Sequence, residues 1–282
     1  DHAEAAYPKE ACGLLLGFQR ADGNIEVTRV AESENKAAPD RNDRFEVDPE
    51  LRLRLMREAR DAAPVGSTGA SRGIGLGLAK EFASRGWNVV ASERTRSEEL
   101  HDAGEIDIVT VDVTEPDSYL GLKNKFGEGS LDAIIVNAGI TGAAHQSAED
   151  ATDEEIAHVM QTNAYGPARV GKALLPLLKD GGTLAFMSSL MGSIADSSGA
   201  YEFYRVSKVG LNMLAKGISE QQAKERKIEV LSLHPGWVQT DMGGPNASIT
   251  VDESCTGLAD VVEKAGGGGY RFVNYKGETI PF

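Results

Sequence analysis

The chain has 282 residues, of which 43 are acidic and 29 are lysine or arginine, so its formal net charge at neutral pH is −14. An acidic chain without a basic cluster is a poor candidate for binding nucleic acid or an anionic membrane. Its two cysteines, Cys12 and Cys255, form no Cys-x-x-Cys pair, so we expect neither a zinc knuckle nor a disulfide framework. No apolar run reaches the roughly 18 residues of a membrane span, and the first residues do not resemble a signal peptide, so we expect a cytoplasmic protein.

Residues 1–62 differ from the rest of the chain. Residues 25–30 have the composition of a strand, and residues 51–60 have the pattern of a charged amphipathic helix. The segment resembles the first half of a JAMM (MPN-type) zinc metallopeptidase, in which the position of Glu10 is the catalytic general acid/base. That family's zinc ligands, a His-x-His motif followed by an aspartate, are missing, and a catalytic zinc needs three protein ligands. We therefore expect a truncated α+β appendage with no metal site, and we interpret Glu10 as a surface or packing carboxylate.

From residue 63 onward, short apolar stretches alternate with helical patterns. The predicted strands are 87–92, 106–111, 131–136, 183–187, 228–233 and 270–273, and the predicted helices are 74–85, 116–126, 153–178, 202–224 and 252–264. Several strands are almost continuously apolar, as expected for parallel strands buried on both faces. The alternation predicts one α/β domain over residues 63–282, with a doubly wound parallel sheet of the Rossmann type. The stretch that should form its central strand contains Pro64 and Gly66, which both weaken strands, so this is the weakest predicted element.

A glycine-rich loop, Thr68-Gly69-Ala70-Ser71-Arg72-Gly73-Ile74-Gly75, follows that stretch. Its three glycines allow a sharp turn and a close approach of the backbone to a ligand. A helix that begins at Gly73 would direct free N–H groups and its positive dipole end at the loop, which suits a pyrophosphate. Such a loop alone is often an ordinary turn, but the nucleotide-type fold that follows favours dinucleotide binding.

Tyr204 and Lys208 are four residues apart, so a helix would place the phenol and the ammonium on one face. A free phenol has a pKa near ~10, and a nearby cation lowers that pKa by favouring the phenolate. The pair therefore predicts a general acid/base for carbonyl reduction or alcohol oxidation. Tyr119 and Lys123 have the same spacing, and we interpret them as a solvated helix face. The context separates the two pairs, because Ser189 and the glycine loop precede Tyr204.

These motifs together resemble those of the short-chain dehydrogenase/reductase family, from about residue 67 to residue 282. Asn137-Ala138-Gly139 after an apolar strand, Asn163 within a helix, and Pro235-Gly236-Trp237-Val238-Gln239-Thr240 match as well. Residues 191–194, 232–244 and 277–282 are most similar to the C-factor/sniffer-like carbonyl reductases of that family. The resemblance implies an NAD(P)-dependent oxidoreductase that interconverts a carbonyl and an alcohol by hydride transfer.

The resemblance also implies the catalytic residues Asn163, Ser189, Tyr204 and Lys208. Tyr204 would be the general acid/base, and Lys208 would lower its pKa and hydrogen-bond the nicotinamide ribose. Ser189 would hold the substrate oxygen near Tyr204, with Ser188 and Ser193 as local competitors for that role. Asn163 would anchor a water or bend its helix as part of a proton relay; a purely structural asparagine is the alternative.

A second set of residues is implied to bind the cofactor. It comprises Gly69, Ser71, Arg72, Gly73, Ile74, Gly75, Arg94, Asp112, Val113, Asn137, Ala138, Gly139, Tyr204, Lys208, Pro235, Gly236, Val238 and Thr240. Arg72 and Arg94 suit a 2′-phosphate, whereas Glu93 favours NAD(H), because an acidic residue after that strand usually holds the free ribose 2′-hydroxyl. Two arginines outweigh one carboxylate, so we expect NADP(H) to be favoured, although Arg94 could simply neutralise Glu93.

We expect a small-molecule carbonyl or alcohol substrate, and a homodimer or homotetramer formed through the long helices 153–178 and 202–224. The apolar outer faces of those helices could equally be covered by residues 1–62. The alternative function is a catalytically weak or inactive NADP(H)-binding regulatory or signalling protein, by analogy with C-factor-like proteins. A metal-dependent isopeptidase is disfavoured by the absent His-x-His motif.

Overall fold

The structure, a computed structural model, describes residues 12–19, 25–33, 64–142 and 145–282. Contacts within the chain divide it into two units after residue 62, and each is described by itself. In the first unit, β1 (Cys12–Gln19) and β2 (Ile25–Ser33) pair antiparallel. Glu10 and the helix predicted at residues 51–60 lie outside the described residues, so the metallopeptidase resemblance stays a prediction.

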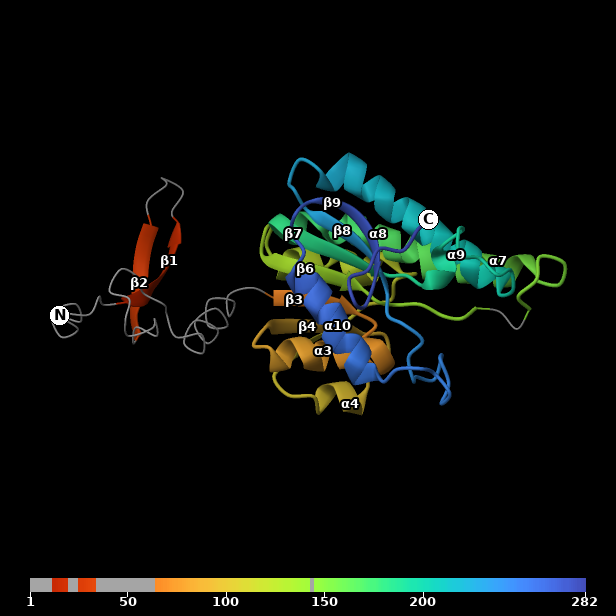
Figure 1. Ribbon diagram of the computed structural model, residues 1–282, viewed down its shortest axis with the longest axis horizontal. Helices are drawn as coiled ribbons and strands as arrows, with labels where there is room; N and C mark the ends of the chain where they lie inside the picture. Colours follow the sequence, from red (N-terminus) through yellow and green to blue (C-terminus); the bar gives the residue numbers. More distant parts are fainter. Residues whose placement is uncertain (1–11, 20–24, 34–63, 143–144) are drawn as a thin grey trace, which may run out of the picture. The chain divides into compact units, whose positions relative to one another are not determined.

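The second unit contains a sheet of seven parallel strands (Figure 1). They are β3 (Pro64–Thr68), β4 (Asn88–Glu93), β5 (Asp107–Thr110), β6 (Leu131–Val136), β7 (Leu178–Met187), β8 (Glu229–His234) and β9 (Gly269–Asn274). Their order across the sheet is β5-β4-β3-β6-β7-β8-β9, so the direction of winding reverses between β3 and β6. In open α/β sheets, such a reversal opens a ligand crevice at the carboxyl ends of the strands. The predicted doubly wound α/β fold is confirmed.

The weakest predicted element, the central strand, is formed. β3 pairs with β4 from Pro64 to Ser67 and with β6 from Val65 to Thr68. Pro64 is the first residue of β3, a position at which proline is tolerated within sheets. The glycine loop therefore starts from the middle of the sheet.

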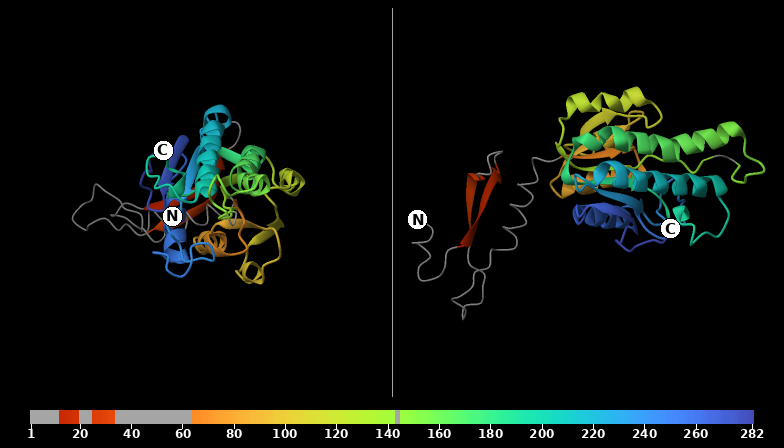
Figure 2. Two further views of the ribbon diagram at one scale, coloured as in Figure 1. Left: turned by 90° about the vertical axis from the view of Figure 1, so that its right-hand side faces the viewer. Right: turned by 90° about the horizontal axis from the view of Figure 1, so that it is seen from above.

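Helices cover both faces of the sheet (Figure 1; Figure 2). α3 (Gly73–Ser84) and α10 (Val251–Glu263) share one buried apolar cluster with β4, β6, β7 and β8. On the other face, α8 (Gly166–Leu174) and α9 (Glu202–Ile218) contribute to a second cluster, which includes Phe186 of β7. The short helix α4 (Glu98–His101) follows β4. Within the part of the chain that the structure describes, every helix is too short or too polar to cross a membrane.

Three predicted helices are not continuous α-helices. The one predicted at 153–178 comprises α7 (Asp153–Met160), a π-helical turn η1 (Gln161–Tyr165), α8 and a 3₁₀ turn η2 (Leu175–Leu177). The one predicted at 202–224 ends in a second π turn, η4 (Ser219–Ala223), and the one at 116–126 is divided into α5 (Pro116–Leu120) and α6 (Leu122–Lys125). The π turns matter most, because they change which side chains face the sheet.

Gly171→Ala in α8 is expected to destabilise the fold. A Cβ atom on Gly171 would lie 2.5 Å from Cζ of Phe186, a fully buried ring, so the helix or the ring must shift. Overpacking of this kind typically costs ~1–3 kcal/mol. Gly217→Ala in α9 is the matched control, because a Cβ atom there meets no other atom within 4 Å and alanine favours a helix interior. Urea denaturation should show a lower free energy of unfolding for Gly171→Ala than for Gly217→Ala; equal values would contradict the packing argument.

Candidate active site at the carboxyl edge of the sheet

Most predicted site residues lie on loops that directly follow strands. Residues 69–75 follow β3, 137–142 follow β6, 188–192 follow β7 and 235–243 follow β8. Because the strands are parallel, these loops meet at one edge of the sheet. The sheet thus brings together motifs that are far apart in the sequence.

The glycine loop is packed tightly against the end of β6. Gly69 and Gly73 have positive φ angles of 70° and 54°, which favour glycine. A Cβ atom on Gly75 would lie 2.1 Å from the carbonyl oxygen of Gly69, so glycine is required there as well. The side chain of Asn137 donates a hydrogen bond from Nδ2 to the same carbonyl at 3.2 Å. Asn137 therefore fixes the shape of the loop from the neighbouring strand.

The N-terminus of α3 points its backbone N–H groups at this loop. No side chain among the described residues caps this terminus, and its first turn holds no acidic residue. These N–H groups and the positive end of the helix dipole therefore suit a phosphate group. The loop after β8 lies alongside, since a Cβ atom on Gly73 would be 3.4 Å from Cγ2 of Thr240. The residues at this end of the site fit the pyrophosphate of a dinucleotide.

Lys208 is buried at the centre of the candidate site. Only 3% of its surface is exposed, and its ammonium donates a hydrogen bond to the carbonyl oxygen of Met187 at 2.8 Å. Burial lowers the pKa of Lys208 from 10.5 to about 8, because the charged form loses its hydration. A Cβ atom on Gly139 would lie 3.3 Å from this ammonium and 3.5 Å from Oδ1 of Asn163, so the glycine leaves room for both groups.

Tyr204 lies one helical turn before Lys208, as predicted, with its ring centroid 5.6 Å from the lysine nitrogen. Burial raises the pKa of Tyr204, and a hydrogen bond with the Ser189 side chain offsets only part of this rise. The prediction that the ammonium lowers this pKa is therefore wrong for this structure. The physical reason is that desolvation of the phenolate outweighs the favourable interactions within the site.

Of the nearby serines, Ser189 is the one whose side chain lowers the pKa of Tyr204 against the larger effect of burial. Its Oγ also accepts a hydrogen bond from the backbone N–H of Met191 at 3.1 Å, which orients it. Ser193 instead accepts a bond from the backbone N–H of Asp196 at 3.2 Å. Ser193 thus has its own local partner, and the role of Ser189 toward a substrate oxygen stays a prediction.

Asn212 is a buried residue that the sequence analysis did not single out. Its Oδ1 accepts a hydrogen bond from Ser188 Oγ at 2.7 Å, and its Nδ2 donates to the carbonyl oxygen of Gly192 at 3.2 Å. These bonds tie the loop that carries Ser189 to α9. The sequence spacing could have identified Asn212, because it lies four residues after Lys208 and so on the helix face that carries Tyr204 and Lys208.

Asn163 is fully buried in the π turn η1, and its side chain is bonded on all sides. Its Oδ1 accepts a bond from the backbone N–H of Ile140 at 2.8 Å, and its Nδ2 donates to the Ile140 carbonyl at 2.8 Å and to Ser207 Oγ at 3.1 Å. Ser207 Oγ in turn donates to the Tyr204 carbonyl at 2.7 Å. These bonds are those expected of a purely structural asparagine, and the role of Asn163 in a proton relay stays a prediction.

The two arginines predicted to favour NADP(H) are placed differently. Arg72 donates from Nη1 to Oδ2 of Asp241 at 3.0 Å, so its charge is already paired. Arg94 also faces a carboxylate, with Nη1 4.0 Å from Oδ2 of Asp112, and both arginine side chains are largely exposed. Because its ion pair is the longer of the two, Arg94 is held less closely than Arg72 and is the freer to bind a phosphate. Val113, beside Asp112, is buried in the apolar core.

The other residues predicted to bind the cofactor are held in place by hydrogen bonds to their carbonyl groups and by close packing at the carboxyl edge of the sheet. The Ser71 carbonyl accepts a bond from Ser97 Oγ at 2.7 Å, and the Ile74 carbonyl accepts one from Cys255 Sγ at 3.5 Å. Ala138 packs on Gly69, where a Cβ atom would lie 3.2 Å from its Cα.

In the loop after β8, the Pro235 carbonyl accepts a bond from Ser254 Oγ at 2.7 Å. Gly236 has a φ of 89°, and Val238 forms a bridge with Ile249. These contacts fix the backbone that leads to Thr240 beside the glycine loop.

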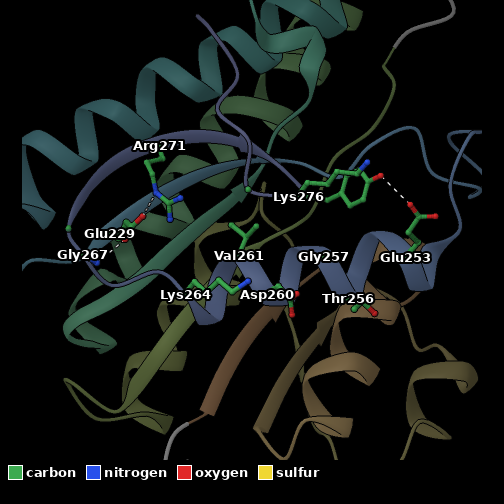
Figure 3. A pocket seen from close by; sticks show the side chains of 13 residues that line it. Glu229, Glu253, Thr256, Gly257, Asp260, Val261, Lys264, Gly267, Arg271 and Lys276 are labelled. Atoms are coloured by element: carbon green, nitrogen blue, oxygen red, sulfur yellow. Dashed lines mark hydrogen bonds and ion pairs between the residues drawn. The ribbon is translucent and has the colours of Figure 1, made fainter.

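A separate hollow of about 810 Å³ lies between α10 and β9 (Figure 3). Its charged side chains are largely paired: Glu229 accepts bonds from Arg271 Nε at 2.5 Å and from the Gly267 N–H at 2.8 Å. None of the predicted site residues lines it. Among the described residues, moreover, no three His, Cys, Asp or Glu side chains are grouped as metal ligands would be. We therefore place the candidate site at the carboxyl edge.

The chain is similar to known proteins in both sequence and fold. A family model described as enoyl-(acyl carrier protein) reductase (adh_short_C2) matches residues 69–256. The chain is 39% identical over 163 residues to the C-signal of Myxococcus xanthus, covering 55% of this chain and 94% of that protein. It is similar to a carbonyl reductase from Pseudomonas aeruginosa PAO1 in complex with NADP, with a TM-score of 0.72 and 39% identity over 78% of this chain and 99% of that one. The carbonyl reductase Sniffer of D. melanogaster gives a TM-score of 0.72 and 30% identity, with the same coverages.

The buried lysine makes a prediction about stability and pH. Lysine titrates at 10.5 when unperturbed and at about 8 in the folded chain, so between these values the unfolded chain binds more protons. The contribution of Lys208 to the free energy of unfolding therefore rises with pH across this window. A Lys208→Met variant lacks this gain. The free energy of unfolding of the wild type minus that of the variant should therefore increase by about 2 kcal/mol from pH 7 to about pH 9.5.

Urea denaturation at the two pH values measures this difference. Lys80→Met, at an exposed position of α3, is the control, and its difference from the wild type should stay nearly constant. An equal pH effect in both variants would contradict the assignment to the buried ammonium.

Proposed function

Because this chain belongs to the short-chain dehydrogenase/reductase family of oxidoreductases, we propose that it interconverts a small-molecule carbonyl and its alcohol with a nicotinamide cofactor. The observation that carries the proposal is that Tyr204, whose pKa the Ser189 side chain lowers against burial, lies on the same helix as buried Lys208, one turn away. This group lies on the sheet edge that also carries the glycine loop.

The cofactor would be held by the glycine loop and the N-terminus of α3 at its pyrophosphate. Asp112 and Asn137 would lie on the adenosine side, and the loop from Pro235 to Thr240 on the nicotinamide side. When bound, the nicotinamide supplies or accepts the hydride. We infer a preference for NADP(H), supported by exposed Arg94 and by the NADP complex of the similar carbonyl reductase from Pseudomonas aeruginosa PAO1.

The chain's own residues would handle the substrate oxygen. Ser189 would donate a hydrogen bond to that oxygen and hold it beside the tyrosine, and Tyr204 would exchange the proton. Since the pKa of Tyr204 is raised, the phenol is protonated at neutral pH and is ready to donate. A protonated phenol is the form that can donate a proton to the oxygen of a carbonyl during reduction. Lys208 would stabilise negative charge on Tyr204 as the proton leaves.

We further propose that a cytoplasmic homodimer or homotetramer forms through the helix pair α7–α8 and α9. Val206 and Met213 on α9 are 56% and 71% exposed, and Tyr165 beside them is 49% exposed. Exposed apolar side chains gathered on one face are typical of an interface between protein chains. Residues 63–282 would be the dinucleotide-binding domain and residues 1–62 the appendage.

One observation favours a second candidate function. The similarity to the C-signal of Myxococcus xanthus covers 94% of that protein. A catalytically weak or inactive NADP(H)-binding regulatory or signalling protein would use the same nucleotide site without turnover. The two candidates differ in whether bound NADPH is oxidised.

Tyr204→Phe should lower turnover by roughly 10²–10⁴-fold, the usual contribution of a general acid/base. The affinity for NADPH should stay nearly unchanged, because the phenylalanine keeps the ring. NADPH oxidation with a panel of aldehydes and ketones measures turnover, and fluorescence titration measures affinity. Tyr119→Phe, in α5 and outside the candidate site, is the matched control. A wild-type chain that binds NADPH but turns over no carbonyl would support the regulatory candidate instead.

Arg94→Ala should weaken NADPH binding roughly tenfold, as expected for the loss of one hydrogen bond to a charged group. NADH lacks the 2′-phosphate, so its dissociation constant should change little. Arg169→Ala, at an exposed position of α8, controls for a general change in net charge. An equal loss of affinity for both nucleotides would contradict the role of Arg94 at the phosphate.

A further inference from the structure

Glu93, the last residue of β4, lies where an acidic side chain usually accepts the ribose 2′-hydroxyl of NAD(H). In this structure its carboxylate is already engaged on both oxygens. Oε1 lies 2.9 Å from Nε2 of His101, and Oε2 accepts a hydrogen bond from the backbone N–H of Ser97 at 2.7 Å. The residue is only 7% exposed. Burial and these two partners together hold the Glu93 carboxylate in an orientation turned away from solvent.

His101 is itself held in place, at the end of the short helix α4. Arg96 also approaches its ring, with Nη1 3.2 Å from Nδ1 and 3.4 Å from Nε2, while Arg96 Nε donates to Glu98 at 2.8 Å. The histidine therefore has a fixed position between a buried carboxylate and a guanidinium. His101 thus forms polar contacts with Glu93 and Arg96 in addition to packing.

The turn between Glu93 and α4 is anchored to the glycine loop as well. Ser97 Oγ donates to the carbonyl oxygen of Ser71 at 2.7 Å, so residues 94–97 have a defined position beside the loop. Arg94, in this turn, keeps an exposed side chain. The same bonds that withdraw the carboxylate thus leave a cation beside the ribose end of the candidate site.

Resting on the proposed function, we propose that His101 determines cofactor choice by holding the Glu93 carboxylate away from the ribose, so that the site accepts a 2′-phosphate at Arg94. A carboxylate released from His101 would lie near that phosphate and repel it, or it would pair with Arg94. The hydrogen bond from His101 is also the main cause of a lowered pKa at Glu93, which indicates that His101 favours the charged form of the carboxylate.

The test measures dissociation constants for NADPH and NADH by fluorescence titration, without a carbonyl substrate. His101→Leu should weaken NADPH binding roughly tenfold or more, the effect of one hydrogen bond to a charged group, while NADH binding stays unchanged or tightens. Adding Glu93→Gln to His101→Leu should restore most of the NADPH affinity, because the released charge is then absent. His158→Leu, at an exposed histidine of α7, is the matched control.

The single variant Glu93→Gln gives a second measurement that does not depend on how His101→Leu folds. It should leave the ratio of the NADPH and NADH affinities within about twofold of the wild-type ratio, since the carboxylate does not serve the ribose. A selective loss of NADH affinity in Glu93→Gln would overturn the inference. So would an equal loss of both nucleotides in His101→Leu without rescue by Glu93→Gln. A wild-type chain that binds neither nucleotide would instead overturn the proposed cofactor site, and the inference with it.

Discussion

A buried ammonium group joins the end of β7 to the helix that carries Tyr204. Removing the charge of Lys208 from water is costly, and the hydrogen bond to the Met187 carbonyl offsets part of that cost. The lysine cannot move without leaving that carbonyl, so α9 is fixed against the edge of the sheet. One turn before Lys208 lies Tyr204, and one turn after it Asn212 holds the serine loop. The meeting of Tyr204 and Ser189 therefore follows from how α9 is anchored.

Most of the fold could be predicted from apolar periodicity, because buried parallel strands and the helices between them leave strong patterns. The central strand shows the limit of this reasoning. Pro64 and Gly66 lower the local preference for a strand, yet β3 forms between β4 and β6, since pairing on both sides outweighs local preference. The π turn η1 was also missed, because its extra residue is stabilised by bonds from Asn163 to Ile140, 23 positions earlier.

The candidate site was predictable where spacing carries the chemistry, as in the glycine loop and in Tyr204 with Lys208. Its electrostatics were not. The direction of the Tyr204 pKa depends on burial, which spacing does not report. Arg72 is neutralised by Asp241, 169 positions away, and that pairing exists only because two loops meet at one edge. In each case the missing information is which distant groups the fold brings together.

The π turn at residues 161–165 has a consequence for how the chain length can vary. Each residue of an α-helix advances the path by roughly 100°, so the extra residue sets the faces of α7 and α8 out of phase by about that angle. Both ends are held: Thr152 and Glu155 form a capping box at the start of α7, and Val170 of α8 is fully buried. A one-residue deletion in this turn would rotate one half of the helix against the other and withdraw Asn163 from Ile140. The turn thus sets the rotation of α8 relative to α7, so a change of chain length there would disturb both helices.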